Sequence, residues 1–200
     1  MSPWLFNLYM DGVVKEFKAR IMGQGVRMLL GSEILNVSCL LFADDTVILA
    51  ESEVQLQHFV KQFVVVCDRR GLKLNVGKSK VMKTSDENGI VGTGDLLVEM
   101  KGDMMEEVSD FLYLGAKVSK DGGMEKELNH RITQARKSAG ALGGMWNNRG
   151  VSIEVKRRMY ESIVVPTVLY GSETWTWSRR VNKKVNVMEM SCLRKMCGVT

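Results

Sequence analysis

Two short apolar segments in the N-terminal half of the chain flank a pair of aspartates. Residues 36–42 (NVSCLLF) and 46–50 (TVILA) are rich in β-branched and bulky side chains, and Ala43, Asp44 and Asp45 lie between them. Short runs of this composition are typical of strands, and Asp favours tight turns because its side chain bonds the local backbone. The pattern therefore predicts a β-hairpin that holds both carboxylates at its tip.

The hydrophobic periodicity then changes to that of a helix. Residues 52–55 (SEVQ) have the form of a capping box, and the apolar residues that follow recur at the three- and four-residue spacing of one helix face. These residues are Leu56, Phe59, Val60, Phe63, Val64 and Cys67. Gly71 predicts a left-handed end to this helix, directly after the basic pair Arg69 and Arg70.

Strand-like and loop-like segments follow this helix. Residues 84–94 are polar and contain glycine, which predicts a loop. Residues 96–100 and 111–118 (FLYLGAKV) predict further strands. The N-terminal part of the chain therefore mixes helix and strand.

Beyond Asp121 the apolar spacing predicts helices alone. The first helix is marked by Leu128, Ile132, Ala135, Ala139, Leu142 and Trp146. Ser152 caps a second helix, which Pro166 ends or kinks, and a third covers residues 181–196. The expected fold class is α+β, with a mixed part at residues 1–120 and a helical part at residues 121–200.

The composition is that of an ordinary globular protein. The chain has 200 residues, of which 45% are hydrophobic and 26% charged. No apolar run approaches the roughly 18 residues that span a bilayer, and residues 4–10 lack the basic start of a secretory signal. We expect an intracellular protein, nuclear or cytoplasmic, with no membrane partner. The cysteines are too scattered for a zinc site and predict reduced, mostly buried thiols; they are Cys39, Cys67, Cys192 and Cys197.

Positive charge gathers toward the C-terminus. The whole chain has a net charge of +5, whereas the residues from Lys126 onward include 14 basic and 5 acidic side chains, a local charge of +9. Such asymmetry is typical of proteins that bind a polyanion, although solvated helix faces give the same pattern.

The aspartate pair is the sharpest chemical feature of the sequence. Adjacent carboxylates at the end of an apolar hairpin repel each other, and a hard divalent cation offsets this repulsion best. Phosphoryl-transfer enzymes use carboxylates at rigid strand ends to hold two such ions. An Asp-Asp pair is also common in solvent-exposed turns that bind nothing. The apolar strands on both sides of Asp44 and Asp45 are the feature that favours a metal site here.

A resemblance to a known family extends over the whole chain. Residues 41–50 (LFADDTVILA) resemble the polymerase signature of reverse transcriptases, specifically those of non-LTR (LINE-type) retrotransposons. Further stretches resemble other parts of these enzymes in the same order. They are residues 2–10 (the end of a helix motif), 71–75 with 78–80 (a loop motif), 111–115 (the primer-grip strand), and Arg131, Ile132, Ala135, Lys156, 169–175 and 193–195 (the thumb and the segment after it).

The resemblance implies a fold and residue roles. It implies a partial palm at residues 1–120, with the hairpin packed on helices, followed by a helical thumb and the next segment at residues 121–200. Asp44 would coordinate the metal, Mg²⁺ or Mn²⁺, with Asp45 as its neighbour, and Lys78 would donate a proton to the departing pyrophosphate. Tyr113, Leu114 and Gly115 would support the primer terminus. The basic helices would grip an RNA/DNA hybrid with Lys126, Arg131, Arg136, Lys137, Lys156 and Arg157.

The resemblance also implies missing parts. In the family, a further catalytic aspartate and the fingers that hold the incoming triphosphate precede the segment at Ser2 and Pro3, whereas this chain begins at Met1. We therefore expect no polymerase activity from the chain alone. We also expect an unpaired hairpin edge, which makes a monomer prone to non-specific association.

Three functions stay open at this point. The chain is an inactive fragment, or an incomplete reading frame, of an RNA-directed DNA polymerase that uses an RNA template, a DNA primer and deoxynucleoside triphosphates. Alternatively, it is a non-catalytic module that binds RNA/DNA through the basic thumb. In the third case, another chain supplies the missing strand, which carries the further catalytic aspartate, and completes an active enzyme. Salt-dependent RNA/DNA binding that survives Asp44→Ala would favour the second.

Overall fold

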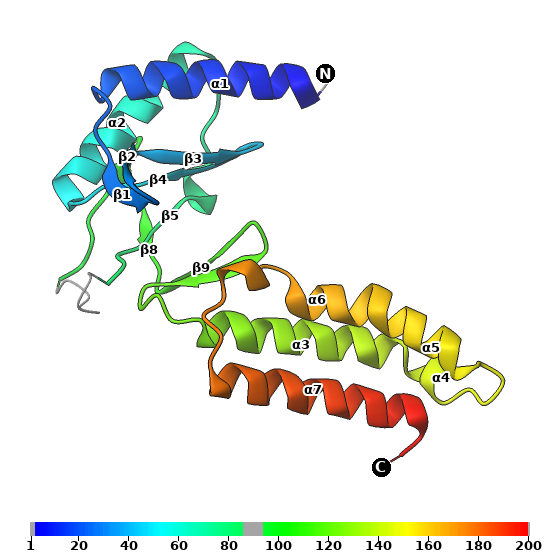
Figure 1. Cartoon of the computed structure of the whole chain (residues 1–200). Helices are drawn as coiled ribbons and strands as arrows, with labels where there is room; N and C mark the ends of the chain where they lie inside the picture. The colour runs from blue at the N-terminus through cyan, green and yellow to red at the C-terminus, as the bar shows by residue number, and fades with distance from the viewer. Residues whose placement is uncertain (1–2, 86–93, 200) are drawn as a thin grey trace. The chain divides into compact units, whose positions relative to one another are not determined.

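The computed structural model describes residues 3–85 and 94–199 and divides into two compact units (Figure 1). The N-terminal unit comprises Met1–Lys83 and Thr93–Val108, and the C-terminal unit comprises Thr84–Gly92 and Ser109–Thr200. Residues 86–93 of the predicted loop, and Ser2 of the helix motif, lie outside the described residues. The predicted α+β class is confirmed, because 52% of the chain is helical and 18% is strand.

Two helices form the centre of the N-terminal unit. They are α1 (Pro3–Arg20) and α2 (Glu53–Arg69). Phe17 of α1 is fully buried and meets Phe59 and Phe63 of α2 edge-to-face, with ring centroids 6.1 and 5.4 Å apart. The predicted start of α2 is confirmed, because the Ser52 hydroxyl accepts the backbone N–H of Gln55 at 3.2 Å.

The hairpin predicted around the aspartates is confirmed, as β3 (Cys39–Phe42) and β4 (Asp45–Ile48). The strand segment predicted at 36–42 is divided, however, because a separate hairpin made of β1 (Val26–Leu30) and β2 (Glu33–Val37) precedes it. The break falls at the buried Ser38, whose carbonyl accepts the N–H of Leu49 at 2.8 Å.

The rest of the N-terminal unit is made of very short elements. A 3₁₀ turn (Val76–Lys78) precedes β5 (Lys80–Val81), which pairs in parallel with β8 (Glu106–Glu107). The strand predicted at 96–100 is reduced to β6 (Glu99–Met100), which pairs with β7 (Asp103–Met104). Leu96 and Val98 are nevertheless buried, so the apolar character of this segment reflects packing against α2 rather than a longer ladder.

The C-terminal unit begins with a hairpin. The prediction of one strand at 111–118 is wrong, because the chain turns between β9 (Asp110–Tyr113) and β10 (Ala116–Ser119). The helical part is confirmed and consists of α3 (Glu125–Ala141), α4 (Gly143–Trp146), α5 (Ile153–Met159), a π-helical turn (Tyr160–Val164), α6 (Val165–Leu169), a 3₁₀ turn (Ser172–Thr174) and α7 (Arg179–Cys197). The hairpin groups with these helices, so the boundary between the compact units falls at Val108 and Ser109, earlier than residue 120.

Side-chain caps and one proline set the ends of these helices. Ser152 and Ser178 accept backbone N–H groups at the starts of α5 and α7, at 3.4 and 3.3 Å. Pro166 lies in the first turn of α6, directly after the π-helical turn, because proline has no N–H to continue the preceding ladder. The helices share one apolar core that contains Ala135, Trp146 and Met188. Within the described part of the chain, no helix is long and apolar enough to cross a membrane.

Candidate functional site

The two aspartates stand at a strained turn. Phe42 pairs with Asp45 across the β3–β4 hairpin, so Ala43 and Asp44 form a two-residue turn. Ala43, the first turn residue, has a φ of +53°, whereas Asp44, the second, does not have a positive φ. Two-residue hairpin turns of this kind favour glycine at the first position. An alanine in this region costs roughly 1–2 kcal/mol. Backbone strain of this kind clusters at functional sites, so the turn itself marks a candidate site.

One face of the hairpin is anchored and the other is open. Cys39 is buried, and Leu41 packs against the same core of α1 and α2 residues. Leu40 and Phe42 point to the opposite face, because side chains alternate along a strand, and they are 45% and 62% exposed. Burial raises the pKa of the Cys39 thiol, so this anchor stays protonated and apolar. The helices therefore fix the hairpin that carries the carboxylates.

The carboxylates are suitable ligands for a hard cation. Asp44 and Asp45 are exposed, and among residues 3–85 and 94–199 neither carboxylate takes part in a hydrogen bond or ion pair. Mg²⁺ is usually held by one or two carboxylates together with substrate phosphates and water. Within the described residues no group of three or more His, Cys, Asp or Glu side chains could hold a metal ion. The pair thus fits a divalent ion that takes its remaining ligands from a substrate or from other residues.

The strain at Ala43 gives a prediction for stability. Ala43→Gly is expected to raise the free energy of unfolding by about 0.5–1 kcal/mol, because glycine adopts positive φ without a steric cost. Urea unfolding followed by far-UV circular dichroism would measure the change. Ala19→Gly, at an exposed position in the last turn of α1, is the matched control and should lose up to about 1 kcal/mol. A loss at both positions would show that Ala43 is not strained.

Lys78 lies at the end of the 3₁₀ turn that follows α2. Its side chain is exposed, and its backbone N–H donates to the Asn75 side chain at 3.1 Å. The structure therefore brings Asp44 and Asp45 together at one tip and places Lys78 on a separate, ordered loop of the same unit.

The predicted primer-grip residues form the turn of the β9–β10 hairpin. Tyr113 pairs with Ala116, so Leu114 and Gly115 are the turn residues, with φ values of +48° and +82°. Positive φ at both positions is typical of the tightest hairpin turns, but leucine rarely adopts it. The Tyr170 hydroxyl donates to the Leu114 carbonyl at 2.7 Å. Tyr170 was not singled out as a site residue from its position in the sequence.

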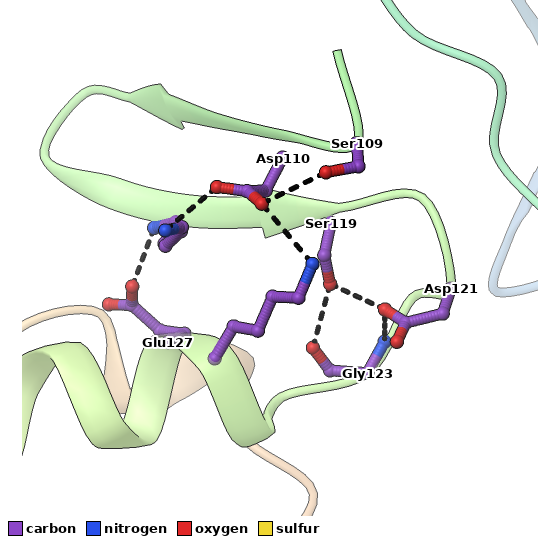
Figure 2. A network of polar contacts seen from close by, with 8 residues as sticks. Ser109, Asp110, Ser119, Asp121, Gly123 and Glu127 are labelled. Atoms are coloured by element: carbon purple, nitrogen blue, oxygen red, sulfur yellow. Dashed lines mark hydrogen bonds and ion pairs between the residues drawn. The ribbon is translucent and has the colours of Figure 1, made fainter.

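A polar network attaches this hairpin to the start of α3 (Figure 2). The Asp110 carboxylate contacts the ammonium groups of Lys117 at 2.7 Å and Lys126 at 3.2 Å. These two lysines lower the pKa of Asp110 to about 2. The Glu127 carboxylate accepts the backbone N–H of Lys117 at 2.5 Å, and the Ser119 hydroxyl donates to Asp121 at 2.6 Å. The hairpin is therefore a fixed part of the C-terminal unit.

The six basic residues predicted to bind nucleic acid do not share one environment. Arg131 and Lys156 are buried, and the Lys156 ammonium donates to the Trp146 carbonyl at 2.6 Å. Their charged groups are therefore not available to phosphates. The exposed members are Lys126, Arg136, Lys137 and Arg157, of which Lys126 and Arg157 contact carboxylates.

A further basic surface lies on α7, where the sequence predicted a helix and a family-like stretch at residues 193–195 but no binding residue. A groove along this helix is lined by four cations that make no ion pair with any described residue, together with Asn182 and Asn186. The cations are Arg179, Lys183, Arg194 and Lys195. Arg179, Lys183 and Arg194 recur at intervals of four and eleven residues, which places them on one face of the helix, and this spacing was the signal that could have identified them.

Comparisons with known proteins give a family match and a relative. Residues 1–118 match the family described as reverse transcriptase (RNA-dependent DNA polymerase). An uncharacterized transposon-derived protein of Caenorhabditis elegans is 27% identical over 170 residues, and the alignment covers 82% of this chain and 58% of that protein. The chain thus spans less than two thirds of this curated relative. No solved structure matches the chain.

Proposed function

The chain belongs to the reverse transcriptase (RNA-dependent DNA polymerase) family, and from this membership we propose that it carries part of the polymerase site of a LINE-type retrotransposon enzyme. The transposon-derived relative supports an origin in a retrotransposon. The family match includes both aspartates, Lys78 and the turn at Leu114. In this proposal the N-terminal unit is the part of the palm with the aspartate hairpin, and the helices of the C-terminal unit form the thumb.

The hairpin tip is the observation that carries the proposal. Asp44 and Asp45 project from a strained turn whose strands are fixed by α1 and α2. Reverse transcriptases generally use divalent metals, and we assign Asp44 as the metal-coordinating carboxylate and Asp45 as the residue that shapes the site beside it. A bound Mg²⁺ or Mn²⁺ supplies charge stabilisation for the attacking and leaving oxygens of nucleotidyl transfer. Lys78 is the proposed donor of a proton to the pyrophosphate that departs.

Family membership implies nucleic acid and deoxynucleoside triphosphates as partners. We propose that an RNA template and a DNA primer contact the exposed cations of the C-terminal unit, such as Arg136 and Lys137. Contacts of this kind neutralise phosphates without reading sequence, so the affinity should fall steeply with salt. The buried Arg131 and Lys156 are left out of this surface.

A non-catalytic nucleic-acid-binding function is the second candidate. The local charge of +9 beyond residue 125 favours it, because this charge is independent of the aspartate pair. The described residues also offer no third metal ligand at the hairpin. Under this alternative, binding to RNA/DNA would depend on salt but not on divalent ions or on Asp44.

Metal-dependent binding separates the two candidates. The wild-type chain would be titrated with a fluorescent DNA primer annealed to RNA, blocked at its 3′ end, together with the matching nucleoside triphosphate. We expect Mg²⁺ or Mn²⁺ to tighten binding about tenfold relative to EDTA, which corresponds to about 1.4 kcal/mol. Asp44→Asn should abolish this gain and leave the salt-dependent affinity in EDTA unchanged.

The control for this experiment is Asp11→Asn. Asp11 is an exposed aspartate of α1 that pairs with Lys15 at 2.7 Å, so its substitution changes the net charge of the same unit by the same amount. This variant should keep the full gain from the metal. A wild-type chain that binds equally well in EDTA and in Mg²⁺ would contradict the catalytic proposal and favour the binding module.

A further inference from the structure

Tyr170 belongs to a sequence motif, residues 169–175, for which the proposed function gives no role. The structure gives it a specific contact. Its hydroxyl donates to the carbonyl of Leu114 at 2.7 Å, although the two residues are 56 positions apart in the chain. The tyrosine therefore ties the end of α6 to the turn of the β9–β10 hairpin.

Arg131 holds the next carbonyl of the same turn. Its guanidinium donates to the Gly115 carbonyl and lies over the Tyr170 ring, 4.5 Å from the ring centroid. Glu127 accepts the Nε–H of Arg131 at 2.5 Å and so fixes the guanidinium in this position. Both carbonyls of the turn thus accept hydrogen bonds from side chains of the helical part of the unit.

The turn has little freedom to rearrange. Leu114 is held at a φ of +48°, which a leucine disfavours, and a Cβ placed on Gly115 would come within 3.4 Å of the Tyr170 ring. The conformation is therefore imposed by Tyr170 and Arg131, because the local sequence at Leu114 does not favour it.

Peptide geometry links the carbonyl of Leu114 to the N–H of Gly115. The two groups belong to one trans, planar peptide, so they point in opposite directions. Since the carbonyl is directed at Tyr170, the N–H of Gly115 is directed away from it. Gly115 is exposed, and its N–H donates to no residue among those that the structure describes. A backbone N–H presented in this way is a donor for a phosphate oxygen.

We propose that Tyr170, supported by Arg131, is a positioning residue that fixes the peptide between Leu114 and Gly115 so that the Gly115 N–H donates to one phosphate of the primer strand. This inference rests on the proposed function, because it takes the primer as the ligand of the turn. In this role Tyr170 acts through the Leu114 carbonyl, to which its hydroxyl donates.

The test measures the contribution of single primer phosphates. A series of template–primers, each with one neutral methylphosphonate in the DNA primer, would be titrated against the full chain. For the wild type, one position near the 3′ end should weaken binding about tenfold, the loss expected for a single charge-assisted hydrogen bond. Tyr170→Phe removes only the hydroxyl. The binding of this variant should no longer be weakened by the methylphosphonate at that one position.

A matched control is Tyr160→Phe, which removes a hydroxyl from a buried tyrosine in the same unit. It should bind with the wild-type pattern, and circular dichroism should show both variants folded. A Tyr170→Phe variant that keeps the full sensitivity would overturn the inference, as would a wild type that binds but is insensitive at every phosphate. Absence of any template–primer binding by the wild type would instead refute the proposed function.

Discussion

Arg131→Met is expected to lower the free energy of unfolding of the C-terminal unit by about 3–5 kcal/mol, because it leaves the Glu127 carboxylate buried without its cation. The Arg131 and Glu127 side chains are only 9% and 8% exposed, and their atoms Nε and Oε1 are 2.5 Å apart. Methionine fills a similar volume, so most of the loss comes from the uncompensated charge. Urea unfolding followed by tryptophan fluorescence measures it, since Trp146 and Trp175 are buried in this unit.

Two further variants separate this explanation from simple loss of packing. The double variant Glu127→Gln/Arg131→Met has no buried charge and should recover a large part of the stability. Arg158→Met breaks an exposed ion pair, in which the side chains of Arg158 and Glu154 are 76% and 54% exposed. This substitution should lower the free energy of unfolding by less than about 1 kcal/mol. Equal losses for Arg131→Met and Arg158→Met would contradict the assignment of a buried ion pair.

The aspartate hairpin and α2 could be predicted because their signals are local. The alternation of Cys39 and Leu41 with exposed neighbours, and the cap at Ser52, are set by residues adjacent in sequence. The β1–β2 hairpin was not predicted because neither strand alternates apolar and polar residues, although the two turn residues between them, Gly31 and Ser32, are typical of a tight hairpin and Gly31 has a φ of +64°.

The environments of the basic residues could not be predicted. Arg131 and Lys156 look like solvated cations in the sequence, but both are held inside the unit by acceptors that no local pattern reveals, the Gly115 and Trp146 carbonyls. The turn at Leu114 was missed for a related reason. Leucine disfavours positive φ, and contacts from distant residues, including Tyr170, impose it there.

The aspartate hairpin and the turn at Leu114 and Gly115 therefore differ in how substitutions should affect them. The proposed catalytic residues were predicted from a short local pattern, whereas the residues that hold the turn at Leu114 and Gly115 depend on contacts across the C-terminal unit. Substitutions at Asp44 should therefore affect chemistry with little effect on stability, because the side chain is exposed. Substitutions at Arg131 should affect stability first.

Primer extension tests the role of Asp44 most directly. Residues 1–200 expressed alone are expected to give background incorporation, because the described residues hold no group of three metal ligands. In a longer polypeptide that contains these residues and extends a primer on poly(A) RNA, Asp44→Asn should lower kcat about a thousandfold. This loss corresponds to about 4 kcal/mol of transition-state stabilisation, the scale of a metal ligand in phosphoryl transfer.

Asp45→Asn should lower kcat less than Asp44→Asn, because Asp44 is in the turn and Asp45 begins β4, where its backbone pairs with Phe42. Asp11→Asn should leave kcat unchanged, since this aspartate lies on the exposed face of α1. A loss of less than tenfold for Asp44→Asn would contradict its assignment as a metal ligand. Incorporation by residues 1–200 alone that disappears in both hairpin variants would show that the chain itself completes the site, so that the expected inactivity is wrong.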